Sequence, residues 1–215
     1  MTEQRQKKMY ILGAGGFARE LYSYLQESSF RYGDYDLAGF LADSSSSLEG
    51  FKFAHQVVGP IRYRKLRIDD VVMMGVSSCE LKKELHSFYS ELGINIISYI
   101  HPTASIGHDV IVGEGSVFGP YALATTNVGV GKCSTINALS TLGHDSVLGD
   151  FCTLSGHCDV TGGVRLGDEV FLGSHVSIMP KIVVGSNVII GIGSVVVKNV
   201  MAGITVFGNP ARKIK

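Results

Sequence analysis

The dominant pattern in the chain is a six-residue repeat of apolar positions that begins at Ile106 and runs without insertion to residue 201. The first position of all sixteen hexads is apolar, and the second is glycine in ten of them. The fifth is always Val, Ser, Ala, Cys or Ile, whereas every Asp, Glu, Lys and Arg falls at the third, fourth or sixth position. A fixed short period predicts stacked coils, each in contact only with its neighbours. We expect the small fifth residues to fill a narrow interior and the second-position glycines to free the corners from steric limits.

Before the repeat, strand-like and helix-like patterns alternate. Apolar runs at residues 8–16, 35–43, 69–77 and 94–100 predict strands. Residues 17–28 and 79–93 have apolar side chains at helical spacing, and Gly93 is placed to end the second helix. Strands that alternate with helices predict a small parallel sheet. We therefore predict an α/β domain at residues 1–98 and a repeat domain at residues 99–215.

Composition narrows the classes of function. The chain has 215 residues, 45% of them hydrophobic, and its nineteen basic residues balance nineteen acidic ones, so no overall field attracts nucleic acid or an anionic membrane. The sequence contains no run of about 18 apolar residues, so it predicts no membrane span. The polar N-terminus does not resemble a secretory signal, and the four cysteines have no C-x-x-C spacing that would indicate a zinc site. We expect a cytoplasmic protein with reduced cysteines.

A glycine-rich turn is the candidate phosphate site of the first domain. Gly13, Gly15 and Ala18 fit the pattern G-x-G-x-x-A between a predicted strand and a predicted helix. The backbone N–H groups of this turn, which also includes Ala14 and Gly16, would meet a phosphate at the helix N-terminus. Asp43, at the end of the second strand, is suited to accept hydrogen bonds from a ribose or a base. About 100 residues make only half of a dinucleotide fold, so a nucleotide sugar fits better than NAD. The alternative is a turn that only packs helix on strand.

The whole chain resembles one group of enzymes, and three stretches carry the resemblance. They are "ILGAGGFARELYSYL" with "LAGFLADS", the linker "YIHPTASIG", and the end "GSVVVKNVMAGITVFGNPARKIK". They are similar to the bacterial branch of the hexapeptide-repeat acyltransferases that N-acetylates nucleotide-linked amino sugars or O-acetylates sialic acid. The resemblance implies a Rossmann-like α/β subdomain followed by a left-handed parallel β-helix with three hexads per coil. It also implies a homotrimer with active sites between subunits, and acetyl-CoA as cosubstrate.

The sequence Gly-His-Asp occurs twice in the repeat, at His108 and His144, which lie 36 residues apart at the same hexad position. With three hexads per coil they occupy one corner, two coils apart. His144 and Asp145 match the family pattern H-[DE]-x-x-[IL]-G-[DE]-[FY], and Asn137 matches its amine-contacting asparagine. The resemblance therefore implies that His144 is the general base, that Asp145 orients it and that Asn137 contacts the amine. For His108 we expect an ordinary solvated corner residue.

The resemblance also implies a pantetheine groove lined mostly by backbone groups. The corresponding positions are Gly162, Ser174 and Ile192. The phosphates of coenzyme A would meet one or more of four basic residues, Lys181, Lys198, Arg212 and Lys213. Many relatives have a second histidine near the acetyl carbonyl. This chain has Thr153 there, so a hydroxyl or a backbone N–H must take that role.

The predicted activity is acetyl transfer from acetyl-CoA to the 4-amino group of a UDP-, dTDP- or GDP-linked 4-amino-4,6-dideoxyhexose, for surface glycan synthesis. The alternatives are O-acetylation of sialic acid or another sugar hydroxyl, and a non-catalytic β-helix that acts as a scaffold or nucleotide-sugar sensor. His157 and His175 raise the question of zinc, as in β-helix carbonic anhydrases. Those enzymes need an H-x₄-H pair, which none of the seven histidines forms, so we predict no metal.

Overall fold

The structure is a computed structural model that describes residues 7–27 and 35–215. The chain separates into two compact units, the first ending at Ile97 and the second beginning at Ser98, except that Ser78–Glu80 belong to the second. Ser28, the last residue of the first predicted helix, and the polar N-terminal segment before Lys7 lie outside the described residues.

The first unit is built on a five-stranded parallel sheet with the strand order β3-β2-β1-β4-β5. Chain order reverses at β1, because α1 leads from β1 to β2 on one side and α2 leads from β4 to β5 on the other. The elements of this part of the chain are β1 (Lys7–Leu12), α1 (Gly16–Glu27), β2 (Tyr35–Leu41), the 3-10 helix η1 (Ser45–Leu48), β3 (Val57–Gly59), β4 (Val71–Met74), α2 (Cys79–Glu91) and β5 (Asn95–Ile96). The predicted parallel sheet is therefore present.

Helix α1 packs through a single apolar stripe. Its buried residues are Ala18, Leu21, Tyr22 and Leu25, which follow the three- and four-residue spacing of one helical face. All four residues of β4 are buried, as expected for a strand inside a parallel sheet. Within the described ranges, no helix is both long enough and apolar enough to cross a membrane.

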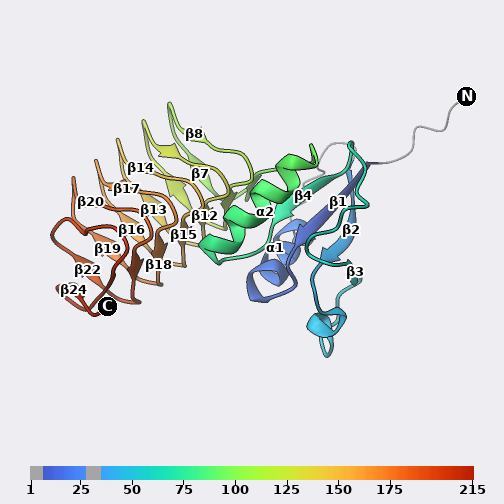
Figure 1. The fold of residues 1–215 in the computed structure, drawn as a ribbon. Coiled ribbons are helices and arrows are strands. Elements are labelled where there is room, and N and C mark those ends of the chain that lie inside the picture. Colours follow the sequence, from blue (N-terminus) through green and yellow to red (C-terminus); the bar gives the residue numbers. More distant parts are fainter. Residues whose placement is uncertain (1–6, 28–34) are drawn as a thin grey trace, which may run out of the picture. The chain divides into compact units, whose positions relative to one another are not determined.

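The second unit is a parallel β-helix whose two-residue strands stack into three sheets (Figure 1). From β6 to β19, each strand pairs in parallel with the strand 18 residues further on, as Thr141 pairs with Asp159, so one coil contains three hexads as predicted. The last coil departs from this spacing, since Ile189 pairs with Thr205 and β23 pairs with β24 in antiparallel orientation. The strands are β6 (Tyr99–Ile100), β9 (Val117–Phe118), β12 (Thr135–Ile136), β15 (Thr153–Leu154), β18 (Phe171–Leu172), β21 (Ile189–Ile190), β23 (Thr205–Phe207) and β24 (Arg212–Lys213) in one sheet; β7 (Ser105–Ile106), β10 (Leu123–Ala124), β13 (Thr141–Leu142), β16 (Asp159–Val160), β19 (Ser177–Ile178) and β22 (Val195–Val196) in the second; and β8 (Ile111–Val112), β11 (Gly129–Val130), β14 (Val147–Leu148), β17 (Arg165–Leu166) and β20 (Val183–Val184) in the third.

The interior of the coils is formed by the first and fifth hexad positions. First-position residues such as Leu154 and Leu172 are fully buried and belong to one continuous core. At several fifth positions a buried hydroxyl or thiol bonds a carbonyl 15 residues further on: Ser140 Oγ donates to Ser155 O at 2.8 Å, and Cys158 Sγ lies 3.2 Å from Gly173 O. Small side chains are favoured at this position because the space is narrow, and these hydrogen bonds satisfy the polar groups that it buries.

The corners correct one sequence-based expectation. The left-handed backbone conformation falls at the fourth hexad position, as at Asn127 (φ 55°) and Asp145 (φ 61°), and not at the second. The second-position glycines have a different function. A Cβ at Gly107 would lie 1.5 Å from Thr125 O, and one at Gly143 would lie 2.5 Å from Gly162 N. Glycine is needed there because stacked turns approach one another closely, rather than for conformational freedom.

Candidate functional site

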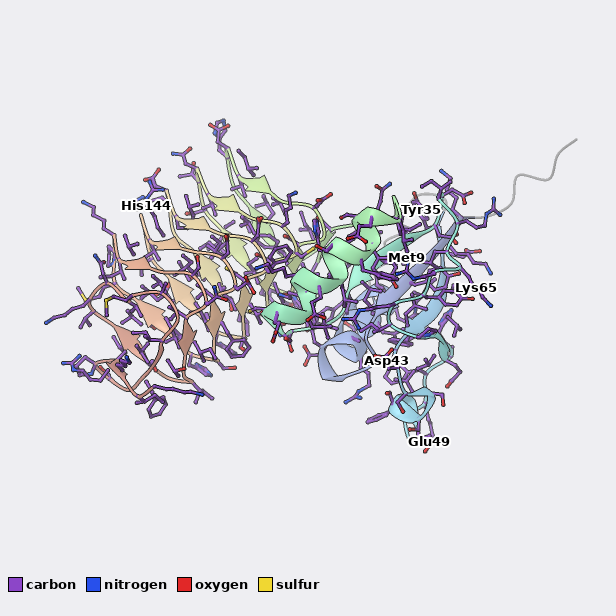
Figure 2. The ribbon with its side chains drawn as sticks, in the orientation of Figure 1. Met9, Tyr35, Asp43, Glu49, Lys65 and His144 are labelled. Atoms are coloured by element: carbon purple, nitrogen blue, oxygen red, sulfur yellow. The ribbon has the colours of Figure 1, made fainter. Side chains whose placement is uncertain are left out.

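The two residues with the strongest sequence signal, His144 and Asp145, form a hydrogen-bonded pair at a corner of the β-helix. They lie in the turn between β13 and β14, and the distance from His144 Nδ1 to Asp145 Oδ2 is 2.7 Å. Figure 2 shows His144 projecting outward from its coil, and its side chain is 68% exposed. With Nδ1 bonded to the carboxylate, a neutral imidazole has its proton on Nδ1 and an available lone pair on Nε2. This arrangement is suited to accept a proton from a substrate.

Asp145 is itself held from the preceding coil. The side-chain amide of Asn127 donates to Asp145 Oδ1 at 3.1 Å, so the two carboxylate oxygens contact two different residues. The hydrogen bond with His144, and then that with Asn127, lowers the pKa of Asp145. The carboxylate is therefore ionised at neutral pH and keeps its capacity to hold the Nδ1 proton of His144. Asn127 did not figure in the sequence-based prediction.

The second Gly-His-Asp copy lacks this support. His108 Nδ1 lies 3.0 Å from Asp109 Oδ2, and both side chains are more than two thirds exposed. In the described part of the chain, no side-chain amide bonds to Asp109, because its coil is the first of the stack. Below His108 the next coil contributes Thr126, whose hydroxyl donates to His108 O. The two copies therefore share a corner, as predicted, and differ in their vertical neighbours.

Gly162 lies directly below His144, one coil further on. A Cβ at this glycine would stand 2.5 Å from His144 Nε2 and 2.7 Å from Cε1, closer than non-bonded atoms approach. The absence of a side chain at Gly162 therefore leaves the space that the imidazole occupies. The backbone N–H of Gly162 also has no acceptor among the residues that the structure describes. A ligand beside Nε2 would find this N–H as a donor.

The remaining predicted residues of the β-helix lie in three different places. Asn137 follows β12, and its Oδ1 accepts a bond of 2.7 Å from the N–H of Ala138. The corner between the first and second sheets contains Asn137, Ser174 and Ile192. His144 lies at the next corner, between the second and third sheets. Lys198 lies at the corner of His144, three coils further on. Thr153 lies on β15 and is only 3% exposed, so the structure gives no support to the prediction that it serves the acetyl carbonyl.

Basic residues converge at the C-terminal end of the coils. A pocket of about 330 Å³ is lined by Lys198, Arg212 and Lys213 together with apolar residues that include Val200 and Val206. These three cations were predicted separately as partners for the phosphates of coenzyme A, and the structure brings them to one pocket. Lys181, the fourth predicted cation, does not line it.

In the first unit, the glycine-rich turn connects β1 to α1 as predicted. Gly13 has a φ of 92°, and its N–H donates to Leu41 O at 2.8 Å, which ties the turn to the end of β2. Ala14 is buried, whereas Gly15 and Gly16 are exposed and a Cβ at either would meet nothing within 4 Å. Helix α1 begins at Gly16, so this open space lies at a helix N-terminus, where a phosphate is stabilised.

The end of β4 forms the other side of this region. Gly75 follows β4, and a Cβ there would lie 2.6 Å from Leu12 O, so the ends of β1 and β4 approach closely. Because chain order reverses between these two strands, their carboxyl ends lie at the position where open parallel sheets usually bind ligands. Sequence reasoning missed Gly75, although it follows an apolar run in the same way as Gly13. Asp43 lies at the end of β2 (Figure 2), and its Oδ1 accepts the N–H of Ile61 at 3.1 Å.

The histidines considered for zinc form a stacked pair. The rings of His157 and His175 lie 4.7 Å apart and nearly parallel, as expected for residues 18 positions apart at one corner. Within the described residues, no group of three or more His, Cys, Asp and Glu side chains is arranged to hold a metal ion.

Comparison with known proteins finds a curated relative that matches part of the chain. No protein-family model matches the chain. The GDP-perosamine N-acetyltransferase of Escherichia coli O157:H7 is 28% identical over 128 residues, which cover 57% of this chain. The match spans 58% of the length of that enzyme.

Solved structures match over nearly the whole chain. The acetyltransferase domain of PglB from Neisseria gonorrhoeae FA1090 superposes with a TM-score of 0.86 and 26% identity, over 97% of this chain and 100% of that one. A structure of the same domain holds acetyl coenzyme A. WeeI from Acinetobacter baumannii AYE superposes with a TM-score of 0.83 and 25% identity, over 97% and 99% of the two chains. The predicted fold, an α/β part followed by a left-handed parallel β-helix, and the predicted resemblance to hexapeptide-repeat sugar N-acetyltransferases are both confirmed.

Proposed function

We propose that the protein is an acetyl-CoA-dependent N-acetyltransferase that acts on the 4-amino group of a 4-amino-4,6-dideoxyhexose linked to UDP, dTDP or GDP. The observation that carries this proposal is the pair of His144 and Asp145, with Nδ1 bonded at 2.7 Å and Nε2 left available. The similarity to a GDP-perosamine N-acetyltransferase and to an acetyltransferase domain with bound acetyl coenzyme A supports the substrates.

The chemistry requires one proton acceptor. The sugar amine attacks the thioester carbonyl, a C–N bond forms, and His144 Nε2 takes the proton that the nitrogen loses. The C–S bond then breaks, and the thiolate of coenzyme A leaves and is protonated. Asp145 keeps the Nδ1 proton in place and stabilises the imidazolium that forms.

The oxyanion that develops on the acetyl carbonyl needs a hydrogen-bond donor. Gly162 N–H is the best candidate, since it lies beside the imidazole of His144 and has no acceptor within the described residues. Thr153 is a weaker candidate because its side chain is buried on another sheet. A donor fixed in the backbone needs no reorganisation during the reaction, which is the property that makes such donors effective.

Acetyl-CoA would lie along the corners of the β-helix. Gly162 and Lys198 line the corner of His144, and Ser174 and Ile192 line the corner of Asn137. A groove between two copies of the chain would combine one corner of each type, which fits a homotrimer with its active sites between subunits. The pocket with Lys198, Arg212 and Lys213 would meet the phosphates of the cosubstrate.

The first unit would hold the nucleotide. The open space at Gly15 and Gly16 has room for a phosphate at the N-terminus of α1, and the reversal of chain order next to it marks a binding crevice. Asp43 has one oxygen bonded to Ile61 N–H, which fixes the direction of the carboxylate at the end of β2. Its other oxygen would accept from the ribose or the base.

The test is a panel of UDP-, dTDP- and GDP-linked sugars, each offered with acetyl-CoA while release of free coenzyme A is measured. We expect turnover with a 4-amino sugar and none with the matched 4-hydroxy sugar. Turnover with sialic acid or another hydroxyl acceptor, and none with any amine, would replace the proposal by O-acetylation. Absence of acetyl-CoA binding in a thermal-shift assay would indicate a non-catalytic scaffold.

A further inference from the structure

The amide of Asn127 carries an inference that goes one step beyond His144 and Asp145. It rests on the proposed function and concerns what holds the base in place. Asn127 lies 18 residues before Asp145, at the same hexad position in the preceding coil, and both residues have the left-handed backbone conformation. Successive coils therefore align the two side chains, and Asn127 Nδ2 donates to Asp145 Oδ1 at 3.1 Å.

This contact fixes a side chain that would otherwise rotate. Asp145 is an exposed residue, and a carboxylate with one partner turns freely about its last side-chain bond. With Asn127 on Oδ1 and His144 on Oδ2, both oxygens are engaged and the carboxylate has one orientation. The imidazole is then held through Nδ1, and the absence of a side chain at Gly162 leaves it space below.

We propose that Asn127 is a positioning residue for acetyl transfer: its amide holds Asp145, and through Asp145 it holds His144 in the Nδ1–H tautomer with Nε2 over Gly162. Asn127 contacts no reacting atom in this scheme. The internal comparison supports the assignment, because the His108 pair shares the Gly-His-Asp sequence and the corner but has no such amide among the described residues.

The variants separate this role from a structural one. Asn127→Asp keeps the size of the side chain and its tolerance of the left-handed conformation, but it replaces the N–H donor by an oxygen that repels Asp145. Asn127→Ala removes the donor and also places alanine at a positive φ. The matched control is Asn187→Ala, since Asn187 has the same hexad position and a φ of 59°, and bonds through its backbone N–H to Asp168 O.

The first readout is steady-state kinetics with the sugar that the wild-type chain accepts. We expect kcat to fall about ten- to a hundredfold in both Asn127 variants, because a base that is misplaced by about an ångström loses this much. The KM for each substrate should stay within about twofold, since Asn127 touches neither. Asn187→Ala should keep the wild-type kcat and share the loss of thermal stability of Asn127→Ala. Wild-type kcat in both Asn127 variants would overturn the proposal.

The second readout does not need activity. Nitrogen-15 NMR of the imidazoles distinguishes the two neutral tautomers, and His108→Ala and His144→Ala spectra assign the two signals. We expect His144 in the Nδ1–H form in the wild-type chain and in Asn187→Ala, and a mixture in Asn127→Asp. An unchanged tautomer in both Asn127 variants would overturn the positioning role even if the chain transferred no acetyl group. Wild-type tautomer control together with absent acetyl transfer would instead contradict the proposed function alone.

Discussion

Replacing His144 by alanine is the most direct test of the candidate site, and the chain supplies its own control in His108. Both histidines lie at one corner of the β-helix and each bonds a neighbouring aspartate through Nδ1. Their side chains are 68% and 82% exposed, so neither substitution opens a cavity in the core. We expect the free energy of unfolding of each variant to lie within about 0.5 kcal/mol of the wild-type value, as is usual for surface substitutions.

The expected loss of activity follows from what remains at the site. A positioned general base contributes about 10²- to 10⁴-fold to the rate, or roughly 3–5 kcal/mol of barrier. Asp145 cannot replace the imidazole, because a carboxylate is a much weaker base than an imidazole. His144→Ala should therefore lose about 10²- to 10⁴-fold in kcat. His108→Ala should keep the wild-type value.

The assay for kcat uses saturating substrates and a thiol reagent that detects the free coenzyme A released by the reaction. Thermal unfolding of each variant shows whether the fold is intact. Raising the pH should recover part of the activity of His144→Ala, since a larger share of the amine is then neutral without a base. A kcat for His144→Ala within about threefold of wild type would contradict the mechanism, given the 10²-fold minimum expected of a base. An equal loss in His108→Ala would show that the effect does not belong to this copy.

Three further outcomes follow from the structure. Gly162→Ala places a Cβ 2.5 Å from His144 Nε2, and we expect the exposed imidazole to move rather than the coil. The expected result is a lower kcat at an unchanged melting temperature. The control is Gly129→Ala, where a Cβ has room. Leu154→Ala should cost about 2–5 kcal/mol in urea unfolding, because the side chain is fully buried in the continuous core. Burial raises the pKa of Cys158 to about 11 and that of Tyr89 to about 12, above the ordinary values of 9.0 and 10.0. The unfolded chain therefore loses these protons first, and stability should fall as the pH rises from about 9 to about 12, by up to about 1.4 kcal/mol per pH unit for each group; unchanged unfolding free energies over this range would contradict the assignment.

The fold was predictable from the sequence because the hexad pattern directly reflects the packing. First-position residues such as Leu154 face the interior in every coil, so sixteen apolar letters in register are enough to place the core. The function of the second-position glycines was not predictable. Glycine is favoured both by a positive φ and by close backbone approach, and the sequence does not distinguish these causes. The structure assigns the first to the fourth position, as at Asp145, and the second to Gly107 and Gly143.

The candidate site was predictable only in part, because its residues meet across coils. His144 and Asp145 are adjacent in sequence and match a known pattern, so the sequence alone proposes them, and the structure shows that they form a hydrogen bond. Asn127 was missed because the coil length of three hexads places it beside Asp145 but does not show that its amide bonds the carboxylate, which the structure shows. Thr153 was proposed from its correspondence to a histidine of relatives, and its burial on another sheet could not be predicted from that correspondence.

The two Gly-His-Asp copies show how a regular repeat can produce one distinctive site. In this β-helix a corner residue contacts the residues 18 positions before and after it as well as its neighbours in sequence. For the pair at His144 these are Asn127 before and Gly162 after, which engage the carboxylate and leave room for the ring. For the pair at His108 there is no preceding coil, and Thr126 follows. Searching such chains for a motif together with its residues at ±18 would therefore distinguish copies with supporting contacts from those that only repeat the pattern.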